Sequence, residues 1–294
     1  MSDHPFTTVR DLLRYAVSRF TEAKLAFGHG CASAYDEAAY LVLHTLHLPL
    51  DTLDPFLDAT LLPAEIERVL SVINRRAGER VPAAYITNEA WMHGYRFYVD
   101  ERVIVPRSFL GELLEEQFTP WIAQPDQISH VLELCTGSGC LAILAAEAFA
   151  QAHIDAVDLS GDALAVAAIN VRDYELQDRI ALHQGDLYAP LPSRRYDLIL
   201  SNPPYVNDQA MQSLPAEYRH EPRMALAGGN DGMEVVRRIN ADAGQWLTPD
   251  GLLVIEVGHE RAHVEAAFPD LEMTWLSTSA GDDMVFLVHA AALP

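Results

Sequence analysis

The sequence has few cysteines, few basic residues and no long apolar run, and each shortage excludes a class of protein. Only three cysteines occur among 294 residues, and without C-x-x-C spacing they predict buried, reduced thiols rather than disulfides or a zinc knuckle. The longest apolar stretch, CLAILAAEAFA, is shorter than the ~18 residues of a membrane span. The first residues, MSDHPFTTVRDLLRY, have no signal-peptide pattern, so we expect a cytoplasmic protein with no membrane partner.

Basic residues are outnumbered, and the imbalance lies mainly in one part of the chain. Lys and Arg number 20 against 42 Asp and Glu, which gives a net charge of −22. Residues 1–106 carry a net charge of −4, and residues 107–294 carry −18. A segment this acidic repels phosphate backbones, so we expect no direct nucleic-acid substrate and favour a basic protein or a cationic cofactor. Acidity that only confers solubility is the alternative.

The N-terminal region predicts a small helical domain. TTVRDLLRYAVSRFTEA, AYDEAAYLVLHTLHL and LLPAEIERVLSVINRRAGER read as three helices, the first with Val9, Leu12, Leu13, Ala16, Val17 and Phe20 on one face. WMHGYRFYVDERVIVP then alternates aromatic and polar residues around Asp100-Glu101, which predicts a β-hairpin. We expect a helical substrate-recognition domain over 1–88 and a hairpin linker over 89–106.

From residue 128 onward, strand and helix patterns alternate. The predicted strands are HVLELC, HIDAVDL, RIALHQGD, YDLILS and GLLVIEVG, and the predicted helices between them are CLAILAAEAFA, GDALAVAAINVRDY and DGMEVVRRINADAGQWL. This alternation predicts an α/β domain over 107–294 with a doubly wound parallel sheet. LEMTWLS and MVFLVHA have no helix between them and predict an antiparallel edge hairpin.

The first loop of the predicted sheet is rich in glycine. ELCTGSG at residues 133–139 lies between the first strand and its helix, where a backbone can approach a ligand closely and a helix N-terminus offers free N–H groups. Asp158 ends the second strand, where a carboxylate can accept hydrogen bonds from both ribose hydroxyls. With Asp186 after the third strand, three strand ends predict one nucleoside site. Helix capping is the alternative for either aspartate alone.

Residues 202–205, NPPY, directly follow the strand YDLILS. Two prolines remove two backbone donors from one turn, so its carbonyl groups are left as acceptors, and Asn202 adds a side-chain oxygen. Such a turn can hold an N–H₂ group. Accepting hydrogen bonds from an amide returns electron density to its nitrogen and points the lone pair along one line. Tyr205 can pack against the planar group. A proline turn that merely ends the strand is the alternative.

A second motif, His259-Glu260-Arg261-Ala262-His263, has the His-Glu-x-x-His spacing of zinc metalloproteases. It starts directly after the strand GLLVIEVG, and with twelve histidines in the chain such a pattern arises easily by chance. We therefore expect no metal here. His44 and His47 are expected to be surface or half-buried side chains rather than ligands.

The glycine-rich turn, Asp158, the NPPY turn and EPRMALAGGNDGMEVVRRI at 221–239 together resemble the S-adenosylmethionine-dependent protein-glutamine N5-methyltransferases over nearly the whole chain. NPPY alone also occurs in nucleic-acid amino-methyltransferases. One branch of the resembled family modifies peptide chain release factors, and another modifies large-subunit ribosomal protein three. Ser108 stands where the release-factor branch usually has an acidic residue, and residues 85–108 resemble the ribosomal branch.

The resemblance implies a Rossmann-like, seven-stranded methyltransferase sheet and direct methyl transfer, so Cys135 is no nucleophile. It implies catalysis by Asn202 and Pro203, with the target glutamine bound by Asn202, Pro203, Pro204 and Tyr205. It implies that residues 135–139, which are Cys135, Thr136, Gly137, Ser138 and Gly139, bind the cofactor together with Asp158. We expect further cofactor contacts from Glu133, Leu159, Asp186, Leu187 and Asn202. Many methyltransferases have glycine where Cys135 stands, so a Cβ atom must fit at that position.

We therefore predict methyl transfer from S-adenosylmethionine, leaving S-adenosylhomocysteine, to the side-chain nitrogen of a glutamine in large-subunit ribosomal protein three. Glutamine methylation of release factors is the nearest alternative. Methylation of an exocyclic amine in nucleic acid would use the same chemistry but needs a basic face. A ribosome-assembly factor that binds cofactor and ribosomal protein without catalysis is the alternative from a different class.

Overall fold

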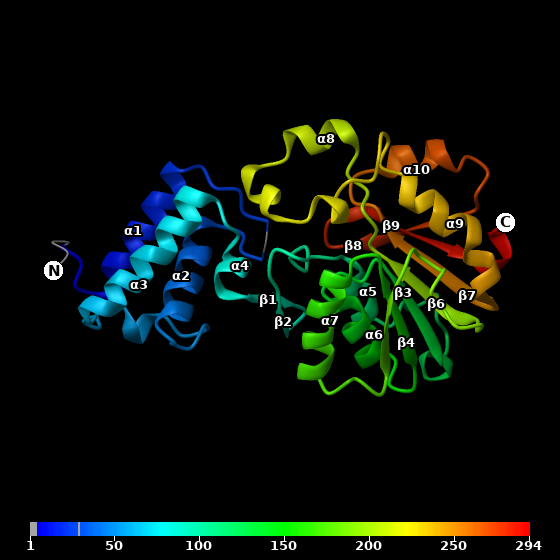
Figure 1. Ribbon diagram of the computed structural model, residues 1–294, viewed down its shortest axis with the longest axis horizontal. Helices are drawn as coiled ribbons and strands as arrows, with labels where there is room; N and C mark the ends of the chain where they lie inside the picture. Colours follow the sequence, from blue (N-terminus) through cyan, green and yellow to red (C-terminus); the bar gives the residue numbers. More distant parts are fainter. Residues whose placement is uncertain (1–4, 29) are drawn as a thin grey trace. The chain divides into compact units, whose positions relative to one another are not determined.

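The computed structural model describes residues 5–28 and 30–294 (Figure 1). The chain divides into two compact units. The helical unit comprises the described residues up to Ala90 together with Pro215–His220, and the sheet unit comprises Trp91–Leu214 and Glu221–Pro294. Residues 215–220 therefore belong to a unit that is otherwise N-terminal, an arrangement for which the sequence carries no pattern.

Amphipathic helices build the helical unit. The first is preceded by a capping box, in which the Thr8 hydroxyl accepts from the Asp11 amide and the Asp11 carboxylate accepts from the Thr8 amide. Its predicted apolar face is buried except for the half-buried Val17. The elements of the unit are α1 Val9–Glu22, α2 Ala34–Thr45, η1 Asp54–Phe56, α3 Pro63–Asn74, the π-helix η2 Arg75–Glu79, α4 Ala83–Thr87 and η4 Ala216–His220.

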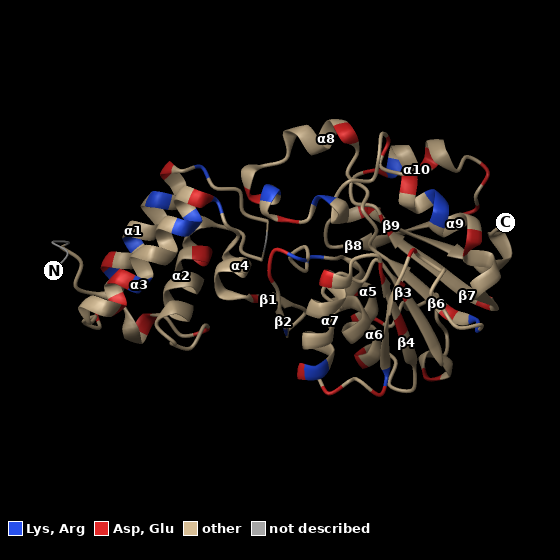
Figure 2. Cartoon of the chain, in the orientation of Figure 1, with Lys and Arg blue, Asp and Glu red and all other residues tan. Residues whose placement is uncertain are grey.

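Acidic residues are spread over the sheet unit. Residues 107–294, which belong to this unit except for 215–220, hold 28 Asp and Glu against 10 Lys and Arg. Figure 2 shows these acidic positions on helices and loops throughout the unit rather than in one segment. Within it, Glu133, Asp155, Glu221 and Glu256 are buried. The exposed carboxylates therefore act together as a diffuse negative field, whereas the buried ones each need a specific partner.

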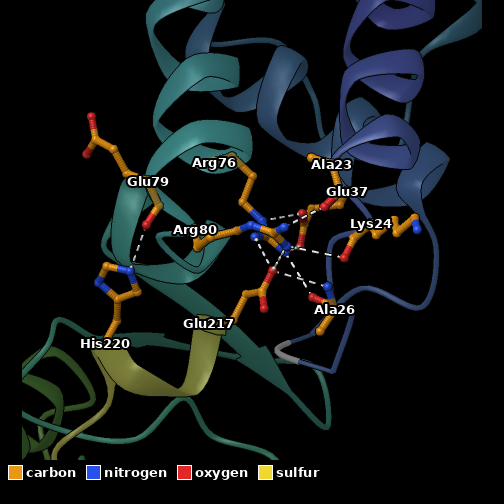
Figure 3. A network of polar contacts seen from close by, with 9 residues as sticks. All are labelled: Ala23, Lys24, Ala26, Glu37, Arg76, Glu79, Arg80, Glu217 and His220. Atoms are coloured by element: carbon orange, nitrogen blue, oxygen red, sulfur yellow. Dashed lines mark hydrogen bonds and ion pairs between the residues drawn. The ribbon is translucent and has the colours of Figure 1, made fainter. Parts of the chain in front are cut away.

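A buried ionic network holds residues 215–220 in the helical unit (Figure 3). Arg76 is 1% exposed, and its Nε donates to Glu37 Oε1 at 2.6 Å while its Nη1 donates to Glu217 Oε1 at 3.4 Å. The same Glu217 oxygen accepts from Arg80 Nη1 at 3.1 Å and from the Ala26 amide at 3.1 Å. Burial opposes the ionisation of Glu217, but these donors outweigh it and lower its pKa. Glu217 is therefore a charged group built into the helical core.

The sheet has seven strands in the order β5-β4-β3-β6-β7-β9-β8. Strands β3 to β7 are parallel, and β9 is antiparallel to both of its neighbours. The predicted doubly wound sheet with an antiparallel edge hairpin is confirmed. The strands are β3 His130–Leu134, β4 His153–Asp158, β5 Ile180–Gln184, β6 Tyr196–Ser201, β7 Leu247–Glu256, β8 Thr274–Thr278 and β9 Gly281–His289.

Helices cover both faces of this sheet. Figure 1 shows α5, α6 and α7 on one face and α9 and α10 on the other. Helix α9 buries Val236, Ile239 and Ala243 against the apolar side chains of β3, β6 and β7. The helices and short turns of the unit are α5 Leu110–Glu115, η3 Pro125–Gln127, α6 Cys140–Ala148, α7 Gly161–Asp173, α8 Asp208–Ser213, η5 Arg223–Ala225, α9 Glu234–Trp246, α10 Arg261–Ala267 and η6 Ala290–Ala292.

The predicted hairpin exists, but its expected position around Asp100-Glu101 is wrong. Strands β1 Glu89–Met92 and β2 Tyr95–Tyr98 turn at His93 and Gly94, whose φ values are +51° and +80°. Two consecutive positive φ values are what a two-residue hairpin turn requires, and glycine meets that requirement easily. Asp100 instead binds the Arg102 guanidinium through both carboxylate oxygens, at 2.9 and 2.6 Å.

Candidate active site

The two predicted loops lie side by side because β3 and β6 are neighbours. Leu134 pairs with Ser201 in the parallel register, and the Ser201 hydroxyl donates to the Leu134 carbonyl at 2.8 Å. The next residues along the two strands are Cys135 and Asn202, so the glycine-rich turn and the NPPY turn leave the sheet at the same edge. The strand order reverses between β3 and β6, and in open α/β sheets ligands bind at such a switch point.

A cavity of about 300 Å³ opens at this edge of the sheet. Its wall includes residues from the ends of four parallel strands, together with side chains from α9 and from the loop before it. Among the predicted site residues, those that line it are Cys135, Gly137, Asp158, Leu159, Asp186, Leu187, Asn202 and Pro204. Within the described part of the chain, the predicted residues outside its lining are Glu133, Thr136, Ser138, Gly139, Pro203 and Tyr205.

Asp158 is fixed by backbone amides. Its Oδ2 accepts from the Gly137 amide and its Oδ1 from the Ser160 amide, both at 2.8 Å. Burial raises the pKa of Asp158, and these amides oppose the rise. Because a carboxylate has about four acceptor positions, Asp158 can still accept a hydrogen bond from a hydroxyl of a ligand. Asp158 thus joins the glycine-rich turn to the second strand and faces the cavity.

Glu133 and Thr136 support the turn from behind. Glu133 is buried, and its Oε2 accepts from the Thr136 hydroxyl at 2.5 Å. Burial raises the pKa of Glu133 to about 8, which the Thr136 hydrogen bond opposes. Gly139 precedes α6 with a φ of +78°, and a Cβ atom there would lie 3.1 Å from the Cβ of Ala167. These residues therefore set the shape of the turn.

The backbone at Cys135 has a conformation that favours glycine. Cys135 has a φ of +63°, in the left-handed region that a Cβ atom makes unfavourable by about 1–2 kcal/mol. Its side chain nevertheless fits and lines the cavity. Burial raises the pKa of the Cys135 thiol to about 12, so the group is protonated at neutral pH and is no nucleophile.

The NPPY turn rests on the loop before α9. The Val206 amide donates to the Leu226 carbonyl and the Gly228 amide to the Val206 carbonyl, both at 2.9 Å. A Cβ atom at Gly228 would lie 2.8 Å from the Pro204 oxygen, so only glycine allows this close approach. The glycines of ALAGGNDG thus support the turn that carries Asn202, and Asn202 Nδ2 donates to Glu256 Oε1 at 3.1 Å.

Asp186 lines the cavity but is already paired. Its Oδ2 accepts from Arg238 Nη2 at 2.7 Å, and both side chains are about half exposed. Arg238 comes from α9, 52 residues further along the chain. The sequence gives no sign of this pair, because Arg238 lies in an ordinary amphipathic helix pattern. A ligand at this end of the cavity therefore meets an ion pair rather than a single carboxylate.

The His-Glu-x-x-His motif does not occupy one helix. His259 lies in the turn before α10, and Glu260 is the N-cap of that seven-residue helix. Glu260 accepts from Asn207 Nδ2 at 3.0 Å and also contacts His263 Nδ1. Among residues 5–28 and 30–294, no group of three or more His, Cys, Asp or Glu side chains is placed to hold a metal ion. In the same residues, no helix is long and apolar enough to cross a membrane.

Comparison with known proteins identifies relatives along the whole chain. Residues 113–218 match the methyltransferase small domain family. The ribosomal protein uL3 glutamine methyltransferase of Burkholderia pseudomallei is 68% identical over 300 residues, which cover 100% of this chain and 98% of that protein. The protein of the same name from Bordetella pertussis is 61% identical over 96% of this chain and 94% of its own length.

A solved structure shares the fold at low identity. The catalytic domain of hMettl16 in complex with a MAT2A 3'UTR hairpin has a TM-score of 0.51 and 16% identity, covering 94% of this chain and 89% of that one. The curated relatives are far closer and extend over both units. With two thirds of its residues identical to one of them from end to end, the chain belongs to the ribosomal protein uL3 glutamine methyltransferase family.

Proposed function

We propose that this protein transfers a methyl group from S-adenosylmethionine to the side-chain amide nitrogen of a glutamine in ribosomal protein uL3, the large-subunit ribosomal protein three. The observation that carries the proposal is the meeting of two loops at one cavity. Asp158 and the glycine-rich turn lie on one side, and the NPPY turn opens onto the same space. The relatives' names supply the substrate.

The residues at the cavity fit the cofactor. Asp158 can still accept a hydrogen bond from a ribose hydroxyl, and the Gly137 amide donates to it. Leu159 and Leu187 offer apolar surface to a base. When bound, S-adenosylmethionine supplies an electrophilic methyl group on a positively charged sulfur, and the negative field of this unit favours a cation.

The substrate amide is held by acceptors. The Asn202 side-chain oxygen and the Pro203 carbonyl accept from the two N–H groups of the target glutamine, which raises electron density on its nitrogen. The new C–N bond forms as the S–CH₃ bond breaks. The proton then leaves to water, because alkylation makes the amide N–H strongly acidic. No general base is required of the protein.

Ribosomal protein uL3 is proposed over a release factor. The support is the relatives' names, together with Ser108, which stands where the release-factor branch usually has an acidic residue. Ribosomal proteins are mostly basic, so the net charge of −18 on residues 107–294 favours encounter with such a partner and disfavours free nucleic acid. Because the proposed substrate is a ribosomal protein, we propose the cytoplasm as the location.

Mass spectrometry of cells lacking this protein tests the substrate. We expect one glutamine of uL3 to lose the mass of a methyl group, while the release factors stay methylated, and we expect the chain supplied in trans to restore the uL3 mark. Loss of the mark from the release factors instead would move the protein to that branch. Transfer of labelled methyl to RNA, or to nothing, would favour the nucleic-acid or non-catalytic alternative.

Replacing Asp158 with alanine is expected to weaken cofactor binding by about 1.5–3 kcal/mol, the range for hydrogen bonds to a charged acceptor. Titration calorimetry with S-adenosylmethionine or S-adenosylhomocysteine measures the change. Asp162→Ala is the matched control, because Asp162 is exposed in the first turn of α7 and does not line the cavity. Equal affinities for the two folded variants would remove Asp158 from the cofactor site.

A further inference from the structure

A buried carboxylate lies directly behind Asn202. Glu256 is the last residue of β7 and is 2% exposed. Its Oε1 accepts from Asn202 Nδ2 at 3.1 Å. Its Oε2 accepts from the Ser108 hydroxyl at 2.5 Å and the Phe109 amide at 2.8 Å, with a longer contact from the Leu110 amide at 3.4 Å. In the described part of the chain Glu256 is not among the residues lining the cavity, so it reaches the reaction only through Asn202.

We propose that Glu256 is a positioning residue that fixes the orientation of the Asn202 amide, so that its oxygen faces the substrate. The inference deepens the proposed function and rests on it. Among the described residues, Glu256 belongs to neither the proposed cofactor contacts nor the proposed substrate contacts. The proposal gives this carboxylate a role.

The chemistry of the two groups allows only one orientation. An ionised carboxylate accepts hydrogen bonds and cannot donate. The Asn202 N–H₂ group must therefore face Glu256, and Oδ1 must turn away from it. The reversed amide would place two acceptor oxygens against each other in a buried site, where an unmade hydrogen bond is costly. The orientation set by Glu256 therefore determines whether the Asn202 side chain presents an acceptor or a donor to the target glutamine.

Ser108 helps to keep Glu256 ionised. Burial raises the pKa of Glu256 to about 7, and the Ser108 hydroxyl, the Leu110 and Phe109 amides and the charge of Arg107 oppose that rise. Arg107 is itself paired with Glu221, at 2.5 Å from Oε1.

Among the described residues, the neighbouring strands place no charged residue beside Glu256 in the register. On β9 its partner across the sheet is Val285, and β6 presents Ser201 and Asn202. A protonated Glu256 gains a donor that the Asn202 oxygen can accept, so the orientation is lost as pH falls below this pKa.

The variant Glu256→Gln separates orientation from folding. The three donors at Oε2 hold the glutamine oxygen in that place, so its nitrogen faces Asn202 and reverses the Asn202 amide. We expect single-turnover methyl transfer to slow by roughly 100-fold, as for the loss of one preorganised polar partner. Cofactor affinity should stay unchanged in calorimetry. Glu272→Gln is the matched control, because Glu272 is exposed in the same unit.

The variant Ser108→Ala gives a second readout that a purely structural role would not change. It removes one donor that stabilises the ionised form of Glu256. The acidic limb of the pH profile of the single-turnover rate should therefore move to higher pH by about one unit. This result is measurable even if Glu256→Gln fails to fold.

An unmoved acidic limb would overturn the proposal. So would a Glu256→Gln rate equal to that of Glu272→Gln. If Asn202→Ala is inactive while folded Glu256→Gln is fully active, the orientation role is wrong and the glutamine methyltransferase assignment stands.

Discussion

Replacing Asn202 with alanine is expected to lower kcat by roughly 10²- to 10³-fold, the effect of removing one preorganised polar partner of a reacting group. The side chain lines the cavity and is held by Glu256, so its oxygen is in place before the substrate binds. Cofactor affinity should change little, because Asp158 and the glycine-rich turn remain. Methyl transfer to purified uL3, measured together with calorimetry of S-adenosylhomocysteine, separates the two effects.

The control for this variant is Asn74→Ala, which removes the same side chain from an exposed position at the end of α3 in the helical unit. Its rate and affinity should match those of the unmodified protein. If Asn202→Ala loses cofactor affinity and turnover in the same proportion, Asn202 belongs to the cofactor site. In that case the Asn202 side chain would not be the acceptor that holds the target amide.

Replacing Arg76 with methionine is expected to destabilise the helical unit by about 3–5 kcal/mol, the cost of breaking a buried ion pair by removing one partner. Methionine fills most of the volume, so the loss comes from leaving Glu37 and Glu217 without their shared guanidinium. Hydrogen exchange of peptides from α2 and α3 reports this unit by itself. Their slowest amides should exchange roughly 100-fold faster or more.

The matched control for Arg76 lies on α1 of the same unit. Arg10 is paired with Asp58 at 2.9 Å, but both side chains are more than half exposed. Arg10→Met should therefore leave the exchange rates nearly unchanged, since water already solvates both charges. Similar exchange in the two variants would mean that the buried network contributes no more to stability than a surface pair.

The sequence predicts the sheet well because its strands are apolar runs separated by helices of regular period. It misplaces the hairpin of β1 and β2 because aromatic and polar residues alternate on both sides of the actual turn, and His93-Gly94 is not one of the common Asn-Gly or Asp-Gly turn pairs. It also misses the π-helix over Arg75–Glu79, where a helical pattern continues without interruption. Local patterns specify an element better than its ends.

The candidate site divides in the same way. Asp158, the glycine-rich turn and NPPY are short motifs whose chemistry can be read from neighbouring residues. The contacts that support Asn202 cannot be read from neighbouring residues, because Ser108 and Glu256 are separated by 148 residues and meet only in the folded sheet. One signal does exist in the sequence. A glutamate inside the apolar strands HVLELC and GLLVIEVG must be buried, and a buried carboxylate requires partners.

The ionic contacts of Glu217 also bear on the order in which the chain can fold during synthesis. Domains generally fold as they leave the ribosome, N-terminal parts first. Helices α1 to α3 and the π-helix that follows them are made early, but the buried Arg76 and the partly exposed Arg80 meet Glu217 only after strands β3 to β6 have been translated. Until then one of the carboxylates that neutralise these arginines does not exist. We therefore expect the part of the protein whose synthesis begins first to be among the last to reach its final structure.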